Sequence, residues 1–339
     1  MSSSKLSIGI VGLPNVGKST LFKLLTKQDV NIANYPFCTI DPNIGIVSVP
    51  DERLDRLAMM SESKKSIPAI VEFYDIAGLV KGAAKGEGLG NQFLSHIREV
   101  NAIVMVLRCF GGEEITHVEN SVDPARDRDI INAELSLKDL ETIEKRLVSL
   151  GAEARGGKKE AVVALPTLQK IKEALMTGGS IYEYADELEV RSLQLLTMKR
   201  QICLLNGAES DVPENLKTEL AKDGVPYVIA NVGNESSAKE ALAAMIREAY
   251  ATLNLISFFT TGVDETRAWT IPRGAKAPEA AGTIHGDFEQ KFIRAETVAT
   301  DVLLEAGSWV QAKAKGKMRL EGREYVVADG DVMVIRHAP

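Results

Sequence analysis

Cysteine is scarce in this chain of 339 residues, and its three copies lie far apart. Cys38, Cys109 and Cys203 form no C-x-x-C spacing, which is typical of zinc sites. The sequence therefore argues against a zinc site. The pattern is typical of a reduced, intracellular protein without disulfides.

The sequence also lacks a long apolar run and a general excess of positive charge. No run approaches the ~18 residues that a membrane-spanning helix needs, and no apolar signal core follows Met1–Lys5. The 40 lysines and arginines stand against 47 aspartates and glutamates, which gives a net charge of −7. We therefore expect a cytoplasmic protein with no membrane partner. Its surface cannot be basic throughout, although a local basic patch for nucleic acid stays open.

The content of apolar residues is ordinary, at 45%, and allows a sizeable core in about one to three domains. Apolar runs alternate with helical stretches early in the chain, which predicts an α/β domain with a mostly parallel sheet. The expected strands are 6–11, 44–49, 69–76 and 102–109. The expected helices are 19–27, 52–60 and 91–100.

After about residue 125 the alternation stops. Apolar residues recur every three to four positions from Ile131 to Leu150, as in an amphipathic helix. A turn at 154–158 and a second helical stretch at 161–176 complete the pattern of an inserted helical hairpin. Ordinary peripheral helices are the alternative.

Strand patterns resume at 201–206 and 226–232. The end of the chain predicts a small α+β domain, with strands at 258–263, 267–271 and 324–335 around a helix near 286–299. The predicted division is a nucleotide-binding domain in two parts, 1–125 and 200–255, a helical insertion, 126–199, and a C-terminal domain, 256–339.

Residues 12–20 read G-L-P-N-V-G-K-S-T and match the phosphate-binding loop in full, between a strand and a helix. Backbone N–H groups of such a loop cradle nucleotide phosphates, and the N-terminus of the next helix adds partial positive charge. We expect Lys18 to reach the β- and γ-phosphates in binding and catalysis, and Ser19 to bind Mg²⁺. The expected nucleotide-binding residues of the loop are Asn15, Val16, Gly17, Lys18, Ser19 and Thr20.

A D-x-x-G motif, Asp75 to Gly78, ends the third strand. Asp75 can hold Mg²⁺ through water, and the N–H of Gly78 can meet the γ-phosphate. Thr39 is the natural second hydroxyl ligand of Mg²⁺. Four glycines within 82–90 predict a segment that orders on the γ-phosphate, with a merely flexible loop as the alternative.

Several stretches resemble the YchF/Obg-like ATPase family of translation-associated P-loop NTPases. Residues 12–20, N-Y-P-F-C-T-I-D-P-N at 34–43 and the D-I-A-G-L-V-K-G stretch that opens 75–91 are similar to its nucleotide-binding motifs. R-A-W-T-I-P at 267–272 and A-A-G-T-I-H-G-D-F-E at 280–289 resemble its TGS domain. The resemblance covers nearly the whole chain. It implies a GTPase-like fold, a coiled-coil insertion and a C-terminal β-grasp (TGS) domain, although the chain looks shorter than typical members after the base-reading motif.

Asn-Lys-x-Asp, the motif that reads guanine, is absent from the sequence. Its aspartate accepts hydrogen bonds from guanine N1–H and the 2-amino group, which adenine does not offer. The N-G-A-E stretch at 206–209 is similar to the Asn-x-x-Glu of the family, which implies base reading by Asn206 and Glu209 and ATP bound at least as well as GTP. Gly207 stands where relatives carry an apolar residue. A second candidate, at 231–235, has its acid one position late.

Leu79 occupies the position where many P-loop hydrolases carry the glutamine that orients the attacking water. An apolar side chain cannot hold that water, so another group must. The resemblance implies His117, with a solvated loop histidine as the alternative. It also implies that Asn15 helps to bind K⁺, which would stabilise charge near the β- and γ-phosphates.

The resemblance implies a slow ATP hydrolase with Mg²⁺ and K⁺ as cofactors, acting as a monomeric, nucleotide-dependent switch on the ribosome. Two basic clusters could neutralise RNA phosphates, and the resemblance favours contact with ribosomal RNA over the alternative of solvated polar faces. The C-terminal cluster comprises Lys313, Lys315, Lys317, Arg319 and Arg323, and the cluster at the hairpin tip comprises Arg155, Lys158 and Lys159.

Three other functions stay open on the sequence. One is a nucleotide-responsive scaffold in stress or translation regulation, in which hydrolysis is incidental. The others are a GTP-using ribosome-associated GTPase and a metabolic phosphotransferase with the same loop. The glycine-rich segment after Asp75 and the two added modules favour a switch over a phosphotransferase.

Overall fold

The computed structural model describes residues 6–26, 43–76, 97–111 and 121–338. The predicted site residues Thr39, Gly78, Leu79 and His117 lie outside these ranges, as do Cys38 and the glycine-rich segment 82–90. No described helix combines the length and the apolar character that crossing a bilayer requires.

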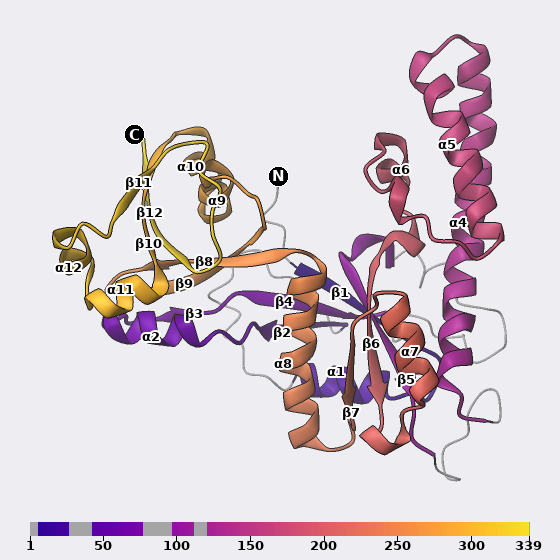
Figure 1. Ribbon diagram of the computed structural model, residues 1–339, viewed down its shortest axis with the longest axis horizontal. Coiled ribbons are helices and arrows are strands. Elements are labelled where there is room, and N and C mark those ends of the chain that lie inside the picture. The colour runs from indigo at the N-terminus through magenta and orange to yellow at the C-terminus, as the bar shows by residue number, and fades with distance from the viewer. Residues whose placement is uncertain (1–5, 27–42, 77–96, 112–120, 339) are drawn as a thin grey trace.

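A six-stranded sheet lies at the centre of the part that carries the phosphate loop (Figure 1). Its order is β2-β4-β1-β5-β6-β7, and every neighbouring pair is parallel except β2 with β4. The mostly parallel sheet predicted from the sequence is therefore confirmed. The strands are β1 (Leu6–Val11), β2 (Ile44–Ser48), β4 (Ile70–Asp75), β5 (Ala102–Arg108), β6 (Arg200–Asn206) and β7 (Tyr227–Ala230).

Helices cover both faces of this sheet, so its apolar central strands β1 and β5 are buried on both sides. Helices α1 (Lys18–Thr26) and α8 (Glu235–Thr252) share one apolar core with β1, β5 and β6. Helices α4 (Pro124–Arg155) and α7 (Glu214–Lys222) pack on the opposite face. All parallel strands therefore end at one edge, and the phosphate loop lies there between β1 and α1.

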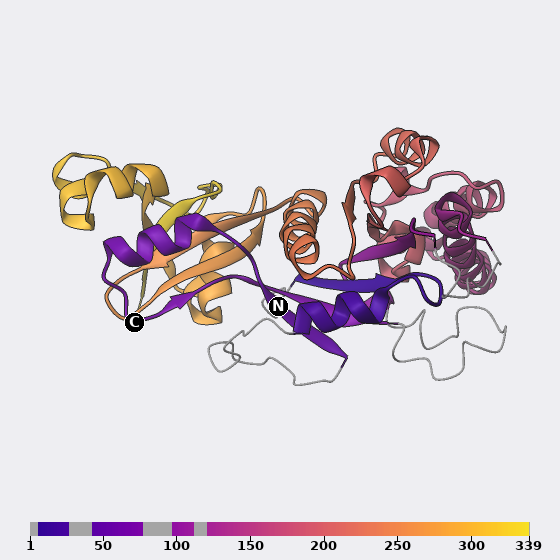
Figure 2. The same ribbon diagram turned by 90° about the horizontal axis from the view of Figure 1, so that it is seen from below.

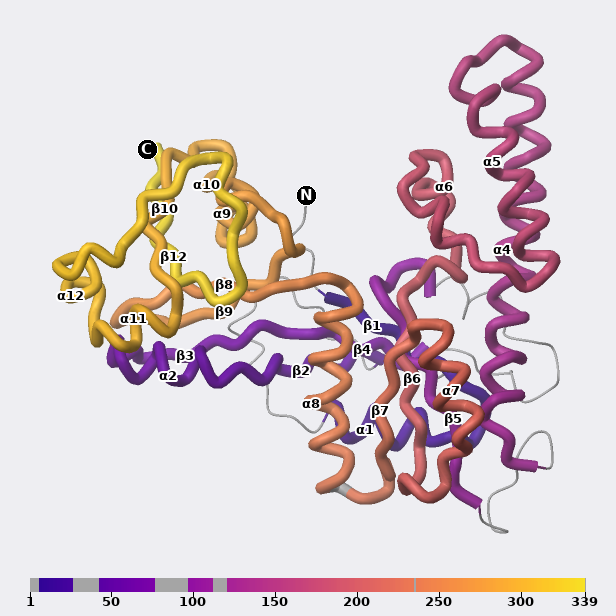
Figure 3. Tube along the Cα trace, in the orientation of Figure 1, coloured from indigo at the N-terminus to yellow at the C-terminus, as the bar shows by residue number. Residues whose placement is uncertain are grey.

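The predicted helical hairpin is present and projects from the molecule (Figures 1 and 3). Helix α4 begins after Asp123, whose side chain caps the helix by accepting a hydrogen bond from Arg126 N. The chain turns at 156–158 and returns as α5 (Lys159–Met176). The two helices pack through an apolar seam that includes Ile143, Leu150, Leu168 and Ile171.

A second six-stranded sheet, ordered β11-β10-β12-β8-β9-β3, forms the C-terminal part. Its strands are β3 (Ser66–Ile67), β8 (Leu255–Thr261), β9 (Thr266–Pro272), β10 (Phe292–Ala299), β11 (Arg319–Glu321) and β12 (Asp331–His337). Short helices cover its two faces. They are α9 (Ala277–Ile284), α10 (Gly286–Gln290), α11 (Thr300–Ala306) and α12 (Trp309–Ala314), while α6 (Leu188–Leu193) belongs to the segment between the hairpin and β6.

The helix predicted near 286–299 is wrong in its second half. Only Gly286–Gln290 is helical there, and Phe292–Ala299 is strand β10, which lies between β11 and β12. Pairing on both sides buries Phe292, Ala295 and Val298 in the cores of the domain, so tertiary packing overrides the local helical pattern. The strand predicted at 324–335 begins only at Asp331.

One segment from early in the chain completes the C-terminal sheet. Between β2 and β4 the chain forms α2 (Glu52–Met60) and β3, and β3 pairs with β9 in parallel. Leu54 and Leu57 of α2 pack in one core with Phe259 and Leu303. Both views place α2, in violet, against the orange and yellow C-terminal part (Figures 1 and 2). The predicted domain boundaries stay predictions, but the packing extends the C-terminal unit to this early segment.

Candidate nucleotide-binding site

The phosphate loop closely approaches the end of β6. Gly17 has φ +106°, and a Cβ atom there would lie 2.4 Å from Nδ2 of Asn206. Asn15 also has a positive φ, +63°. Glycine at position 17 thus allows a backbone conformation and a close approach that a larger residue would prevent.

Lys18, the first residue of α1, is only 8% exposed. Its Nζ donates a hydrogen bond to the carbonyl oxygen of Leu13 in the loop. Burial lowers the pKa of Lys18 to about 8, and the nearby charge of Asp75 opposes this shift. The ammonium group is thus held at the loop, where a phosphate group would compensate its loss of hydration.

Asp75 is the last residue of β4 and is buried beside Ile10 of β1 in the register. The side chains of Ser19 and Thr20 are exposed at the start of α1. Mg²⁺ prefers hard oxygen ligands such as hydroxyl and carboxylate groups. Ser19 and Asp75 fit this preference, while the third predicted ligand, Thr39, lies outside the described residues.

Asn206 joins three elements at the carboxyl edge of the sheet. Its Nδ2 donates to the carbonyl of Val16 at 2.9 Å, and its Oδ1 accepts from the N–H of Val232 at 3.1 Å. The residue is 2% exposed, so both hydrogen bonds are shielded from water. The amide side chain therefore fixes the phosphate loop to β6 and to the segment after β7.

Glu209 lies three residues later in a 3₁₀ turn, Glu209–Asp211. Its side chain is 72% exposed and forms an ion pair with Lys217 of α7 at 2.6 Å. A Cβ atom on Gly207 would lie 3.1 Å from Cβ of Cys109 and 3.3 Å from Asp211. Glycine therefore fits a narrow space, and the predicted base-reading pair lies where β6 ends.

The second candidate for base reading, at 231–235, has a structural role. Oδ1 of Asn234 accepts hydrogen bonds from the N–H groups of Ser236 and Ser237 and caps α8. Oδ1 of Asn231 accepts from the N–H of Gly233. Both side chains therefore serve a turn and a helix start.

Arg108 lies near the end of the apolar run at 102–109, which predicted a strand but no role for this side chain. This arginine is 1% exposed at the end of β5, opposite Asn206 in the register. Its Nε donates to the carbonyl of Phe110 at 3.1 Å, and its guanidinium lies 4.5 Å from the centre of the Phe110 ring. A charged side chain is costly inside a buried apolar strand, so the arginine in this run could have marked position 108 as unusual from the sequence alone.

The sheet is mostly parallel and covered on both faces, the phosphate loop lies between β1 and α1, and Asp75 ends β4. These features define a P-loop nucleoside triphosphatase of the GTPase-like class. A family model described as 50S ribosome-binding GTPase matches residues 7–141. The model YchF-GTPase_C, described as a protein of unknown function (DUF933), matches residues 255–338.

The chain belongs to the YchF family. It is 45% identical to the ribosome-binding ATPase YchF of Bacillus subtilis (strain 168), over 98% of this chain and 99% of that protein. It is 42% identical to Obg-like ATPase 1 of Oryza sativa subsp. japonica, over 98% and 92%. The structure of the Schizosaccharomyces pombe YchF GTPase matches with a TM-score of 0.86 and 38% identity, over 98% of each chain.

Proposed function

We propose that this chain is a slow ATP hydrolase whose nucleotide state controls its binding to the ribosome. The observation that carries the proposal is Asn206, which joins the phosphate loop to β6 and is followed by Glu209 instead of a guanine-reading aspartate. The names of the relatives, a ribosome-binding ATPase and an Obg-like ATPase, support both parts.

Competition between ATP and GTP for the purified protein tests the base preference. We expect ATP to bind at least as tightly as GTP, because Glu209 follows Asn206 where guanine-specific proteins carry an aspartate. Asn231→Ala should leave the ratio of the two affinities unchanged, since this side chain serves a local turn. A tenfold preference for GTP, about 1.4 kcal/mol, would instead identify a GTP-using enzyme.

In the proposed mechanism the loop N–H groups and Lys18 hold the β- and γ-phosphates. Ser19 and Asp75, together with Thr39, would hold Mg²⁺, which when bound neutralises phosphate charge. Lys18 remains charged when phosphate is present because an opposite charge raises the pKa of an ammonium group. Asn206 holds the loop in position through the Val16 carbonyl.

His117 is the proposed group that orients the attacking water, and Asn15 the proposed aid to K⁺ binding. Turnover should be slow and faster in K⁺ than in Na⁺. Equal rates in the two salts, together with a silent Asn15→Ala, would remove the role of K⁺. Unchanged turnover in His117→Ala would remove the role of the histidine.

For the ribosomal partner we propose contact with RNA through the C-terminal basic cluster and the hairpin tip. Lys313, Lys315 and Lys317 are exposed around the end of α12. Arg319 has a structural role as well, because its Nη2 donates to the buried Asp331 at 3.0 Å. The lysines are therefore the cations of this cluster to test first.

At the hairpin tip, Lys158 forms an ion pair with Glu153 at 2.7 Å. Arg155 and Lys159 are exposed beside it. Because the hairpin projects from the molecule, its tip can reach a large partner without contact from the sheet (Figure 3). We propose the tip as the second, weaker contact with RNA.

Co-sedimentation with purified ribosomes over a salt series tests this part. Binding should weaken steeply with salt and should be stronger with a nonhydrolysable ATP analogue than with ADP. Replacing Lys313, Lys315 and Lys317 by alanine should reduce the slope of log affinity against log salt by roughly 2–3. Alanines at Lys23, Lys222 and Lys239, exposed lysines of the nucleotide-binding part, are the matched control. No pelleting at low salt in either nucleotide state would refute ribosome binding.

A scaffold and an enzymatic switch differ in what hydrolysis contributes. A variant that binds ATP but does not hydrolyse it should stay on the ribosome if hydrolysis releases the switch. Normal release and normal cell growth with such a variant would favour the scaffold. A turnover assay without an added acceptor separates both from a phosphotransferase.

A further inference from the structure

The edge formed by β2 and β4 connects the nucleotide site with the C-terminal sheet. At one end of this pair, the N–H of Asp75 donates to the carbonyl of Asn43 at 3.0 Å. At the other end, the N–H of Val49 donates to the carbonyl of Ala69 at 2.8 Å, and α2 and β3 lie between them in the chain. One continuous strand pair therefore has the predicted magnesium ligand Asp75 at one end and the segment that joins the C-terminal sheet at the other.

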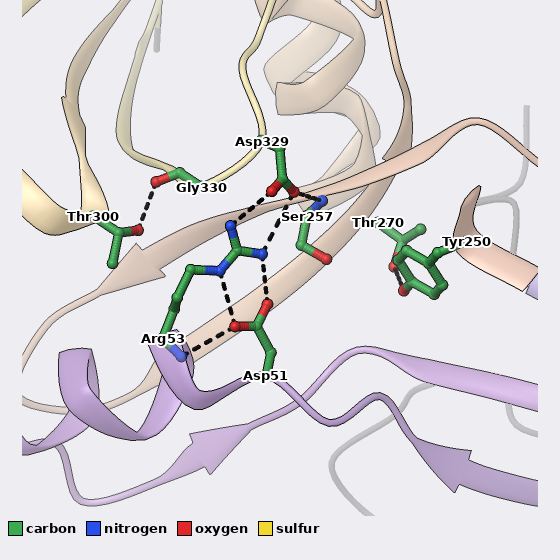
Figure 4. A network of polar contacts seen from close by, with 8 residues as sticks. All are labelled: Asp51, Arg53, Tyr250, Ser257, Thr270, Thr300, Asp329 and Gly330. Carbon is green, nitrogen blue, oxygen red and sulfur yellow. Dashed lines mark hydrogen bonds and ion pairs between the residues drawn. The ribbon is translucent and has the colours of Figure 1, made fainter. Parts of the chain in front are cut away.

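Arg53 adds a polar contact between α2 and the C-terminal part, beside the apolar core of Leu54 and Leu57 and the pairing of β3 with β9 (Figure 4). Its Nη2 donates to Asp51 and its Nη1 to Asp329, each at 2.7 Å. Asp329 also accepts a hydrogen bond from the N–H of Ser257 in β8 at 2.9 Å. The guanidinium lies 5.2 Å from the centre of the Phe259 ring. One side chain therefore bridges two carboxylates from opposite ends of the chain.

The surroundings of Arg53 are shaped to receive a guanidinium. Gly330 has φ +87°, and a Cβ atom there would lie 2.9 Å from Nη1 of Arg53. The carbonyl of Gly330 accepts hydrogen bonds from the N–H and hydroxyl of Thr300, so the loop is fixed from within the C-terminal part. Burial alone would raise the pKa of Asp329, but hydrogen bonds from Arg53 and Ser257 hold it below its ordinary value. The ion pair therefore persists at neutral pH.

Within the described residues, a second attachment joins the same sheet to a different part of the nucleotide-binding fold. The hydroxyl of Tyr250 in α8 lies 2.5 Å from that of Thr270 in β9 (Figure 4). Helix α8 packs on the shared core of β1, β5 and β6. The contact at Arg53 thus joins the C-terminal part to the segment that continues from the β2–β4 edge. The contact at Tyr250 joins it to α8, which packs on the central strands.

We propose that Arg53 couples the β2–β4 edge to the C-terminal sheet, so that nucleotide state sets the orientation of this sheet relative to the helical hairpin. The inference rests on the proposed function in that the orientation would regulate ribosome binding. A small displacement of β2–β4 against the sheet centre turns the C-terminal part about its attachment at Tyr250. Arg53 is a coupling residue and does not contact nucleotide. Such couplings typically change affinity about 5–150-fold.

A distance measurement tests the coupling without the ribosome. Spin labels on unnatural amino acids at Lys158, in the hairpin tip, and at Leu320, exposed on β11, report the orientation of the two parts by pulsed dipolar spectroscopy. In the full-length wild type, the distance distribution should differ between a nonhydrolysable ATP analogue and ADP. Arg53→Gln should reduce this difference, although the Leu54–Leu57 core and the β3–β9 pairing remain, while the protein stays folded and its basal ATP turnover is unchanged.

Two further variants make the result decisive. Asp329→Asn removes a charge but keeps an oxygen acceptor for the N–H of Ser257, so it should reproduce the effect of Arg53→Gln. Arg336→Gln removes an exposed ion pair with Glu296 inside the same sheet and should leave the difference intact. If Arg53→Gln does not fold, Asp329→Asn decides alone. A wild type without a nucleotide-dependent difference, or a folded variant at either position that retains the difference undiminished, overturns the coupling.

Ribosome co-sedimentation separates this inference from the proposed function. If the wild type binds ribosomes better with the ATP analogue, the ratio of the two affinities should fall towards one in Arg53→Gln. If the wild type does not bind ribosomes at all, the proposed function fails. The spectroscopic difference still tests the coupling in that case.

Discussion

Lys18 carries its positive charge in a place from which water is largely removed. The pKa of about 8 means that the ammonium group loses part of its protonation within the physiological range. A lysine whose pKa is lowered by burial recovers its proton when an anion arrives. Nucleotide binding and proton uptake at this residue are therefore linked.

The linkage predicts uptake of about half a proton when nucleotide binds at pH 8. Because the free form titrates near 8 and the bound form at higher pH, affinity should fall as pH rises above 8, by up to about tenfold per unit. Isothermal titration calorimetry in buffers of different ionisation enthalpy measures the uptake. In Lys18→Met the uptake should disappear, and an uptake that persists in this variant would assign it to another group.

Asn206 is the other residue on which the site depends. Asn206→Ala leaves the carbonyl of Val16 and the N–H of Val232 without their side-chain partner, at a cost of about 1–3 kcal/mol for each group that stays unsatisfied. We expect a lower melting temperature and at least a tenfold loss of ATP affinity. Thermal unfolding and fluorescent-nucleotide titration measure the two effects, and Asn231→Ala should show neither.

Motifs could predict the residues of this site that belong to a short sequence pattern with known chemistry. The phosphate loop follows β1, Asp75 and Asn206 end β4 and β6, and their types match the chemistry of phosphate and base binding. Arg53 and Asp329 could not be found in this way, because 276 residues separate them. Each looks like an ordinary surface charge until the sheets are assembled.

Among the elements, the helical hairpin depends on one buried carboxylate at its base. Asp139 of α4 accepts hydrogen bonds from the N–H groups of Leu196 and Thr197, each at 2.8 Å, and from the Thr197 hydroxyl at 2.7 Å. Burial raises the pKa of Asp139, although these hydrogen bonds oppose the shift. The Asp139 carboxyl group therefore binds a proton more tightly in the folded state than in the unfolded chain. The contribution of Asp139 to stability increases as pH falls from its folded pKa towards 3.8.

Asp139→Ala should free the segment at 195–198 from α4, because the two N–H groups and the hydroxyl of this segment lose the carboxylate that accepts their hydrogen bonds. We expect the free energy of unfolding to fall by at least ~2 kcal/mol. Hydrogen exchange should also become faster at 195–198. Exchange measured by mass spectrometry and urea unfolding test the two effects. Asp186→Ala, which removes an exposed ion pair with Arg191, should change neither.

Sequence periodicity predicted helices α4 and α5 better than strand β10. Helices α4 and α5 repeat their apolar positions over many turns, so few alternatives compete with the pattern. Strand β10 has eight residues, and its neighbours β11 and β12 come later in the chain. Its conformation is decided by pairing, which local sequence does not contain.

At the scale of the whole molecule, the two sheets found in the described residues share one stretch of chain. Leu54 and Leu57 of α2 cover Phe259 and Leu303 of the C-terminal part. Burying two leucines stabilises a protein by roughly 3–6 kcal/mol, which is comparable to the entire stability of many small domains. The C-terminal part is thus a structural unit only together with α2 and β3.

A fragment of residues 255–338 should therefore fail to fold cooperatively when it is produced alone. We expect strong binding of an apolar dye and no sharp thermal transition by circular dichroism. Linking a copy of residues 49–69 to the fragment should restore the transition and reduce dye binding. A stable isolated fragment with a sharp transition would contradict the shared core.

The pairing of β3 with β9 also has a consequence for synthesis of the chain. Residues 66–67 pair with 266–267, so β3 and α2 leave the ribosome about 200 residues before their partners. At typical rates of about 5–20 residues per second, this interval lasts about 10–40 s. During it, Leu54 and Leu57 face solvent on the nascent chain. A holding chaperone should recognise this segment early in translation and release it once the C-terminal strands emerge.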